Sequence, residues 1–170
     1  MFNYIKDKKF KFEDLELNDL RFYFLSSIFV LGNLLLPMLF HQVGLAGKLF
    51  LPIYMFVLIA GYKYGWKAGM LVGVLSPYLN HLITGMPPLY AIIKGVLLGV
   101  IAAVVAKKFQ KITMLNLGLV IISYQVIGMI AESLLIGKLA FTNIYLAIPG
   151  MTLQLILGYV ILKFINHHGN

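Results

Sequence analysis

Two side chains of opposite charge interrupt stretches of the sequence that are otherwise apolar. Lys94 lies within residues 89–106, and Glu132 lies within residues 112–136. An ionisable side chain inside a membrane is costly and is by default a candidate functional residue. At a rise of 1.5 Å per residue, Lys94 lies about 9 Å and Glu132 about 6 Å from the nearer ends of their stretches. These similar depths predict that the two charges share one site.

Such a lysine could hold a carboxylate, a phosphate or an amide-rich ligand through charge-assisted hydrogen bonds. Several other polar side chains are expected at the same level of the membrane. The expected substrate-binding set comprises Lys94, Glu132, Gln125, Asn80, His81, Tyr54, Asn143 and Gln154. Two alternatives stay open. Lys94 could extend its ammonium to the outer headgroups, or it could form an ion pair with Glu132 that only holds two helices together.

The same residue types give little support to catalysis or to a metal site. Two histidines and one carboxylate at unrelated positions are a weak zinc pattern, so neither a metal nor another cofactor is expected. The sequence contains no H-E-x-x-H, G-x-S-x-G, G-x-G-x-x-G or P-loop pattern. Only one carboxylate, Glu132, lies inside an apolar stretch, so a paired-acid mechanism has no second member. The expectation is a protein that is not an enzyme.

The elements that must position these residues are predicted to be membrane helices. Of the 170 residues, 61% are hydrophobic and 12% are charged, whereas a soluble domain is nearer half apolar and a quarter charged. The predicted fold class is an all-α integral membrane protein, a bundle of six transmembrane helices in residues 22–165, with residues 166–170 as a tail. The expected spans are 22–40, 45–62, 68–84, 89–106, 112–136 and 143–165. The second and third are short, and as a re-entrant hairpin they would leave four spans.

Basic residues predict the orientation of these spans. Of the 14 lysines and arginines, eleven fall in the termini and in the connections on one side of the bundle, and two fall in the opposite connections. Cytoplasmic loops carry the excess of lysine and arginine. Both termini are therefore expected in the cytoplasm, and the protein in a cell inner or plasma membrane. This topology places Lys94 and Glu132 in the outer leaflet.

Residues 1–21 form an amphipathic N-terminal segment that is expected in the cytoplasm. It holds five of the six acidic residues, mixed with lysines and with large apolar side chains. This composition is typical of a helix that lies along the inner leaflet. Docking to a soluble partner is the other interpretation.

The stretch "GYKYGWKAGMLVG" places Gly61, Gly65, Gly69 and Gly73 four residues apart. Residues at this spacing share one face of a helix. Between membrane helices small residues permit close packing, because lipid supplies little hydrophobic drive for association. The glycines could serve a tight turn and packing inside the bundle. They could instead form a smooth face on which a partner docks.

Three features together resemble the substrate-binding S components of energy-coupling factor (ECF) vitamin transporters. They are "LP" at residues 51–52, the glycine ladder above, and the turn "TGMPP" at residues 84–88, within six short spans. The resemblance covers most of residues 22–165 and implies capture of a vitamin-like ligand near the outer face. Cobalamin, riboflavin, lipoate and queuosine-type bases are its candidate substrates. It implies a transmembrane T component, docked on the glycine face, and two cytoplasmic ATPases as partners.

Two rival classes are a solitary carrier or channel and a structural membrane scaffold. A self-contained carrier usually shows paired half-repeats and interrupted helices, and no internal repeat is evident in this sequence. A scaffold has no need of Lys94 and Glu132. The composition thus favours a membrane protein with a polar site.

Overall fold

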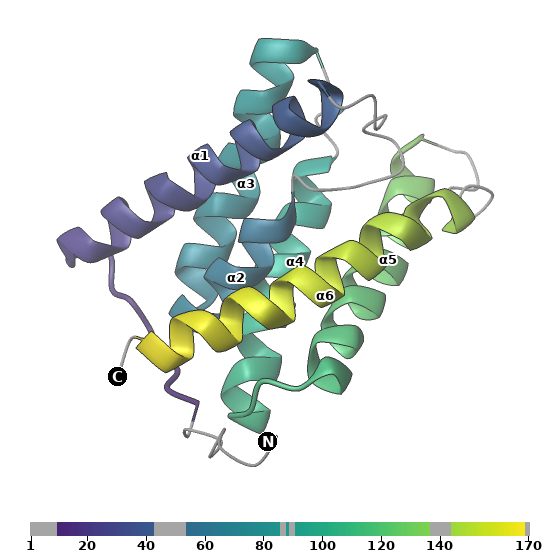
Figure 1. Ribbon diagram of the computed structural model, residues 1–170. Coiled ribbons are helices and arrows are strands. Elements are labelled where there is room, and N and C mark those ends of the chain that lie inside the picture. The colour runs from purple at the N-terminus through teal and green to yellow at the C-terminus, as the bar shows by residue number, and fades with distance from the viewer. Residues whose placement is uncertain (1–9, 43–53, 86–87, 89–90, 137–143, 169–170) are drawn as a thin grey trace.

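Six α-helices make up the fold in a computed structural model that describes residues 10–42, 54–85, 88, 91–136 and 144–168. Each of the six apolar stretches expected from the sequence holds one of them (Figure 1). The helices are α1 (Leu20–Gln42), α2 (Met55–Tyr64), α3 (Trp66–Thr84), α4 (Ala91–Phe109), α5 (Met114–Ile136) and α6 (Ile144–His168). Helices are the only regular elements in the described ranges, so the all-α class is confirmed for them.

Length and composition qualify three of the described helices to cross a membrane. These candidate spans are Leu20–Met38 in α1, Met114–Leu135 in α5 and Ala147–His168 in α6. By contrast, α2 has 10 residues, which gives it a length of about 15 Å at 1.5 Å per residue. This length is roughly half the thickness of a 30 Å hydrocarbon core. The first part of the second expected span lies outside the described residues. The structure therefore supports a multi-pass membrane protein, while a count of six crossings stays a prediction.

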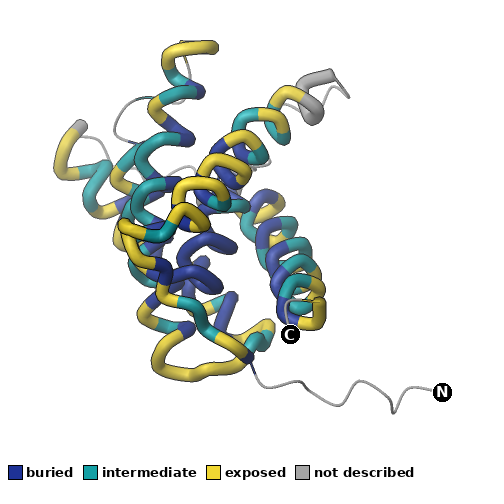
Figure 2. The backbone as a smooth tube through the Cα atoms, turned by 90° about the vertical axis from the view of Figure 1, so that its left-hand side faces the viewer, coloured by how far each residue is buried: buried dark blue, intermediate teal, exposed yellow. Residues whose placement is uncertain are grey.

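The short helix α2 lies at the centre of the bundle. Val57, Leu58, Ile59 and Ala60 are completely buried, as expected of a helix that is apolar on every side. It packs against α3, α4, α1 and α6, and α6 also contacts α5. Figure 2 shows the buried residues in the middle of the bundle and the exposed residues on its outer turns.

Glycines bring the backbones of α2, α3 and α4 into direct contact. A Cβ atom added to Gly69 would lie 2.7 Å from Cα of Gly99 on α4, and one added to Gly73 would lie 2.5 Å from the carbonyl oxygen of Gly95. A Cβ on Gly61 would likewise collide with the backbone of Gly99. These glycines therefore face α4 and are not a free docking surface. Of the two alternatives, packing inside the bundle is the one that applies to these glycines. Only a residue without a side chain lets two helix backbones approach so closely.

Gly65 has a different role from the other glycines of the ladder. It joins α2 to α3 with φ +94°, a conformation that side chains rarely permit. A Cβ on Gly65 would also collide with the Asp14 carboxylate. This position is the tight turn expected from the sequence, covered by the N-terminal segment and closed to a docking partner.

Residues 10–19, which we call the strap, cross the α2–α3 turn without forming a helix. The amide of Glu13 donates to the carbonyl of Lys63 at 3.0 Å, and the amide of Leu15 donates to that of Tyr64 at 3.2 Å. Phe10 and Leu15 are buried in the core. The described part of the N-terminal segment thus differs from the expected interfacial helix, because its amides bond to the turn and its apolar side chains bury in protein.

A buried lysine, which the sequence did not single out, explains why the strap stays in place. Lys63 is 1% exposed. Its ammonium lies 3.2 Å from Glu13 Oε1 and donates to the carbonyl oxygen of Lys11 at 2.5 Å, and the ring of Phe10 lies 5.7 Å away. A buried charge must be paired and hydrogen-bonded. The strap supplies both partners.

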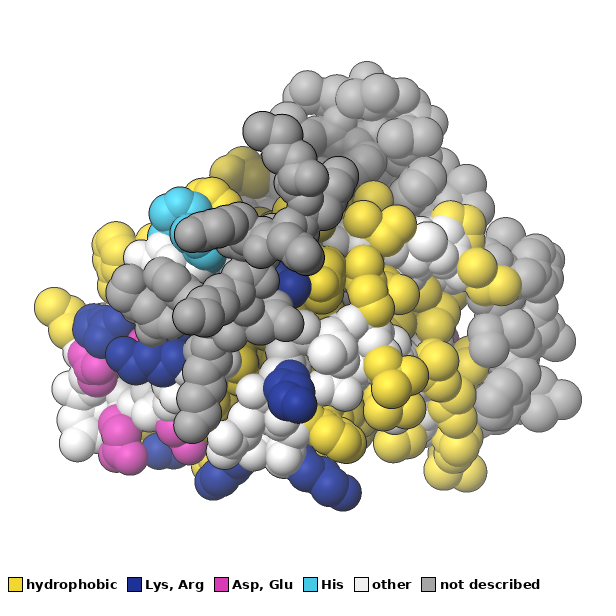
Figure 3. Space-filling model, turned by 60° about the horizontal axis from the view of Figure 1, so that its bottom comes forward, with side chains coloured by type: hydrophobic (Ala, Val, Ile, Leu, Met, Phe, Trp, Pro, Cys, Tyr) yellow, Lys and Arg dark blue, Asp and Glu magenta, His cyan; other side chains and the backbone are white. Residues whose placement is uncertain are grey.

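The two ends of the described chain meet at one end of the bundle. The amide of Lys11 donates to Oδ1 of Asn166 in α6 at 3.2 Å. Lysines and arginines gather over the same end (Figure 3). This arrangement agrees with both termini being on one side of a membrane, and which side stays a prediction.

Candidate functional site

The two charges that the sequence placed within apolar stretches pair with each other. Lys94 Nζ on α4 lies 2.6 Å from Glu132 Oε2 on α5, and the side chains are 17% and 18% exposed. The expectation that they are neighbours is confirmed. A short charge-assisted contact of this kind is among the stronger polar interactions in proteins. The pair brings two opposite charges into an apolar environment together, and it joins α4 to α5.

A glycine on α5 makes room for this pair. A Cβ added to Gly128 would lie 2.7 Å from Cγ and 3.3 Å from both Cδ and Cε of Lys94. The methylene stem of Lys94 therefore lies against the backbone of α5 and carries its ammonium to Glu132, one helical turn beyond Gly128. Gly128 and Glu132 are four residues apart and share one helix face. This spacing is the sequence signal that could have indicated the place where the Lys94 stem lies against α5.

A chain of hydrogen bonds near the ion pair joins α4 and α5 to two further helices, α2 and α6. The Tyr54 hydroxyl donates to the carbonyl of Ala91 at 2.9 Å, three residues before Lys94 on α4. Gln154 Nε2 on α6 donates to the carbonyl of Tyr54 at 3.2 Å, and Gln154 Oε1 accepts from the Tyr124 hydroxyl on α5 at 3.0 Å. These groups are buried. Together with the ion pair they form what we call the polar seam, which ties α2, α4, α5 and α6 together.

Asn33 on α1 makes a second buried polar connection. Its Nδ2 donates to Ser76 Oγ on α3 at 2.9 Å, and its Oδ1 accepts from the amide of Phe56 at 3.0 Å. The Phe56 amide is one of the first amides of α2, which have no partner within their own helix. Asn33 therefore caps α2 from a neighbouring helix, and the sequence alone did not identify Ser76 as its partner.

The remaining expected substrate-binding residues are placed less closely together. Gln125 is 4% exposed, and its Oε1 has no hydrogen-bond partner among the described residues. Asn80 is buried near the end of α3, and His81 beside it is partly exposed. Asn143 lies outside the described residues. The structure thus joins Lys94 to Glu132 and Tyr54 to Gln154, and a ligand-binding role for the set stays a prediction.

A metal centre finds no support within the described part of the chain. No group of three or more histidine, aspartate or glutamate side chains there could hold a metal ion. The polar seam contains one carboxylate, one ammonium, amides and phenols. Its chemistry is that of hydrogen bonding and of one ion pair.

The comparisons with known proteins give a partial match. The chain is 33% identical over 67 residues to the A subunit of NADH-quinone oxidoreductase from Paracidovorax citrulli, and 34% identical over 67 residues to its counterpart from Verminephrobacter eiseniae. Each match covers 35% of this chain and 56% of the relative, so the chain spans about half the length of the curated relatives it matches. No family model and no solved structure matches the chain.

These matches correct the function inferred from the family resemblance. The expectation of a vitamin-capturing ECF component is wrong, because the relatives found belong to NADH-quinone oxidoreductase. The prediction that a T component and two ATPases are its partners is wrong for the same reason. The physical reason for the error is that short apolar helices, glycine ladders and proline turns follow from packing in lipid. They recur in unrelated membrane proteins.

Proposed function

We propose that this chain is a multi-pass membrane component of a respiratory assembly of the NADH-quinone oxidoreductase type. The observation that carries the proposal is the match to the same component of that oxidoreductase from two organisms. The partners of the chain are then other membrane proteins of such an assembly. In this proposal the chain has no catalytic centre of its own.

The distribution of exposed apolar side chains supports a component of a larger membrane assembly. Within the three candidate spans, 28%, 44% and 22% of the residues are buried in α1, α5 and α6, respectively. Large apolar side chains on the outer faces include Phe24, Leu31, Leu35, Leu134 and Val160. Lipid tails or apolar faces of other proteins can cover such surfaces, whereas water cannot do so without a large free-energy cost.

The polar seam supports a structural role within that assembly. In a membrane, helices associate through close packing and interhelical hydrogen bonds. Here the glycine contacts hold α2, α3 and α4, while the Lys94–Glu132 pair and the Tyr54–Gln154–Tyr124 bonds attach α5 and α6. We propose that these polar groups set the positions of α5 and α6 for contact with neighbouring proteins.

Native electrophoresis of membranes that contain the tagged chain tests the proposal. We expect the chain to migrate in a high-mass band that stains for NADH-dependent reduction. Deleting the gene should lower NADH–quinone oxidoreductase activity in isolated membranes, and a plasmid copy should restore it. Migration as a small species, with unchanged activity in the deletion strain, would contradict the proposal.

The topology is tested separately by reporter fusions at Asn170. The eleven-to-two distribution of basic residues predicts a cytoplasmic signal. Because Lys11 bonds to Asn166, a fusion at the N-terminus should report from the same side. An extracytoplasmic signal at Asn170 would reverse the orientation assigned to the polar seam.

A further inference from the structure

A groove lies between α5 and α6. Its volume is about 200 Å³. It is lined mainly by apolar side chains, namely Ile121 and Ile122 beside Gly118 on α5, and Met151, Leu155 and Thr152 on α6. A methylene group is similar in size to a water molecule, which occupies about 30 Å³. The groove therefore has room for several methylenes of one hydrocarbon chain.

Gly118 opens this groove without serving contact between helices. A Cβ atom added there would have no other atom within 4 Å. At Gly69 and Gly99, by contrast, an added Cβ would collide with the opposite backbone. The hollow at Gly118 is thus available to a molecule from outside the chain.

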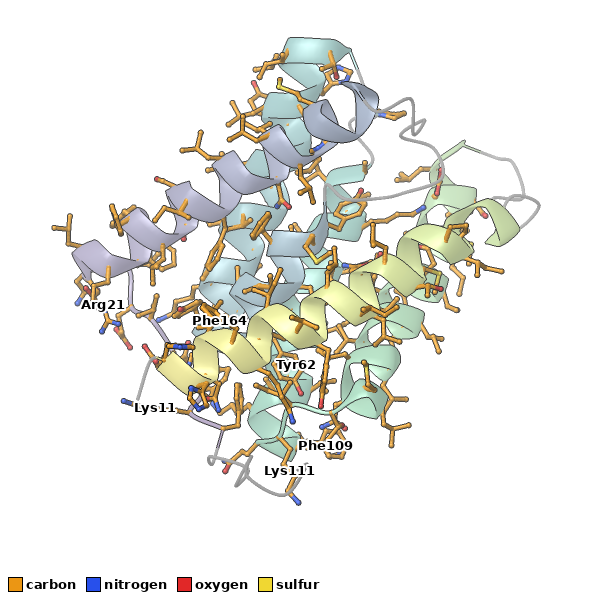
Figure 4. The ribbon with its side chains drawn as sticks, viewed as in Figure 1. Lys11, Arg21, Tyr62, Phe109, Lys111 and Phe164 are labelled. Carbon is orange, nitrogen blue, oxygen red and sulfur yellow. The ribbon has the colours of Figure 1, made fainter. Side chains whose placement is uncertain are left out.

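Basic side chains lie at the end of the bundle where α4 ends and α5 begins. Lys107 and Lys108 end α4, Lys111 precedes α5, and all three are exposed. Lys111 lies three residues before α5 begins at Met114, and Gly118 lies four residues into that helix, or about 6 Å along it. Figure 4 shows Lys111 at the base of the ribbon, beyond the first turn of α5. Among the described residues, the ion pairs involve Arg21, Lys63, Lys67 and Lys94 and leave these three lysines out.

We propose that the groove binds one anionic phospholipid, with an acyl chain between α5 and α6 and its phosphate at Lys108 and Lys111. Basic side chains on the cytoplasmic side of membrane helices attract anionic headgroups. The lining of the groove suits an acyl chain, and Lys111 precedes the first turn of the helix that carries Gly118, as a headgroup at the end of such a chain requires. This site is independent of the proposed respiratory role.

Lys111 can be neutralised without disturbing the turn that carries it. Its carbonyl oxygen accepts hydrogen bonds from the Tyr62 hydroxyl at 2.6 Å and from Asn116 Nδ2 at 3.1 Å. Both bonds use the backbone, so Lys111→Gln removes the charge and keeps them. Arg21→Gln is the matched control, because it removes an exposed positive charge at the same end of the bundle, on α1.

The test reconstitutes the full chain in vesicles of mixed phosphatidylcholine and phosphatidylglycerol, extracts it in mild detergent, and counts retained lipids by native mass spectrometry. The wild type should retain phosphatidylglycerol in preference to phosphatidylcholine. Gly118→Leu fills the groove and should abolish this preference. Val126→Leu, which adds bulk to α5 at an exposed position outside the groove, should preserve it. Thr152→Phe fills the groove from α6 and serves as a second variant should Gly118→Leu fail to fold.

The charge variants give a graded result. One lysine near an anionic surface contributes about 1 kcal/mol, so Lys111→Gln should lower phosphatidylglycerol retention about fivefold, and Arg21→Gln should leave it unchanged. Equal retention of both lipids by the wild type would overturn the proposal. Undiminished retention in both groove-filling variants would overturn it as well.

Discussion

The contacts around Gly99 and around Gly118 show two opposite uses of the same residue. At Gly99 on α4, the backbones of Gly61 and Gly69 come so close that no side chain fits. At Gly118 on α5 a side chain would meet open space. The first site joins α2, α3 and α4 by direct backbone contact, whereas α5 and α6 are joined by polar bonds and leave a groove between them.

This difference indicates how the two halves of the bundle gain stability in lipid. Because lipid tails are as apolar as leucine, helices associate through close van der Waals contact or through hydrogen bonds between helices. The centre of this bundle uses the first means. The Lys94–Glu132 and Tyr124–Gln154 contacts use the second.

The largest effect is expected from Gly99→Leu. Overpacking commonly costs about 1–3 kcal/mol and sometimes more. We expect a loss of more than about 3 kcal/mol of unfolding free energy, because the side chain would separate α4 from two helices at once. The measurement is thermal unfolding of the purified protein in detergent. Gly118→Leu is the matched control and should unfold within a few degrees of the wild type; equal destabilisation of both variants would erase the contrast.

The next largest effect is expected when the ion pair loses one member. Removing one partner of a buried pair costs about 3–5 kcal/mol, and the partial exposure of Lys94 and Glu132 places Lys94→Met near the lower limit. We therefore expect a loss of about 3 kcal/mol in chemical unfolding. The double variant Lys94→Met with Glu132→Leu should recover much of it, because no unpaired charge remains. A single variant as stable as the wild type would show that the pair does not hold α4 against α5.

Tyr124→Phe tests the hydrogen bonds of the polar seam. It removes the hydroxyl that donates to Gln154 Oε1 and leaves that buried acceptor without its partner, a change that costs about 1–3 kcal/mol. We expect about 2 kcal/mol from equilibrium unfolding. Tyr23→Phe, at a tyrosine that is 52% exposed, should change stability by less than about 0.5 kcal/mol. If the two variants are alike, the seam does not stabilise the attachment of α6.

The smallest effect, of opposite sign, is expected from Gly118→Ala. Alanine is favoured over glycine within a helix by about 0.5–1 kcal/mol, and the added methyl group meets no other atom. The variant should therefore unfold at a slightly higher temperature. Gly99→Ala should unfold at a lower one, and a gain of stability there would contradict the close backbone contact.

Much of the architecture follows from local features of the sequence. Five of the six apolar stretches give their helices to within a few residues, for example 22–40 against Leu20–Gln42, and 112–136 against Met114–Ile136; the second, 45–62, is described only from its later part, where α2 is Met55–Tyr64. That Lys94 and Glu132 are neighbours follows from their similar depth, whereas whether they pair with each other was left open by the sequence. Both predictions rest on counting residues along helices, whose rise per residue is known.

The tertiary structure decided the features that depend on which surfaces meet. The spacing of Gly61, Gly69 and Gly73 defines one helix face. A face without side chains does not indicate which helix packs against it, and only the tertiary structure shows that this helix is α4. Lys63 reads as a cytoplasmic positive charge in the sequence, yet the strap buries it. The hydrogen bonds that hold the strap join residues far apart in the chain, and apolar periodicity, which determines each helix separately, contains no information about them.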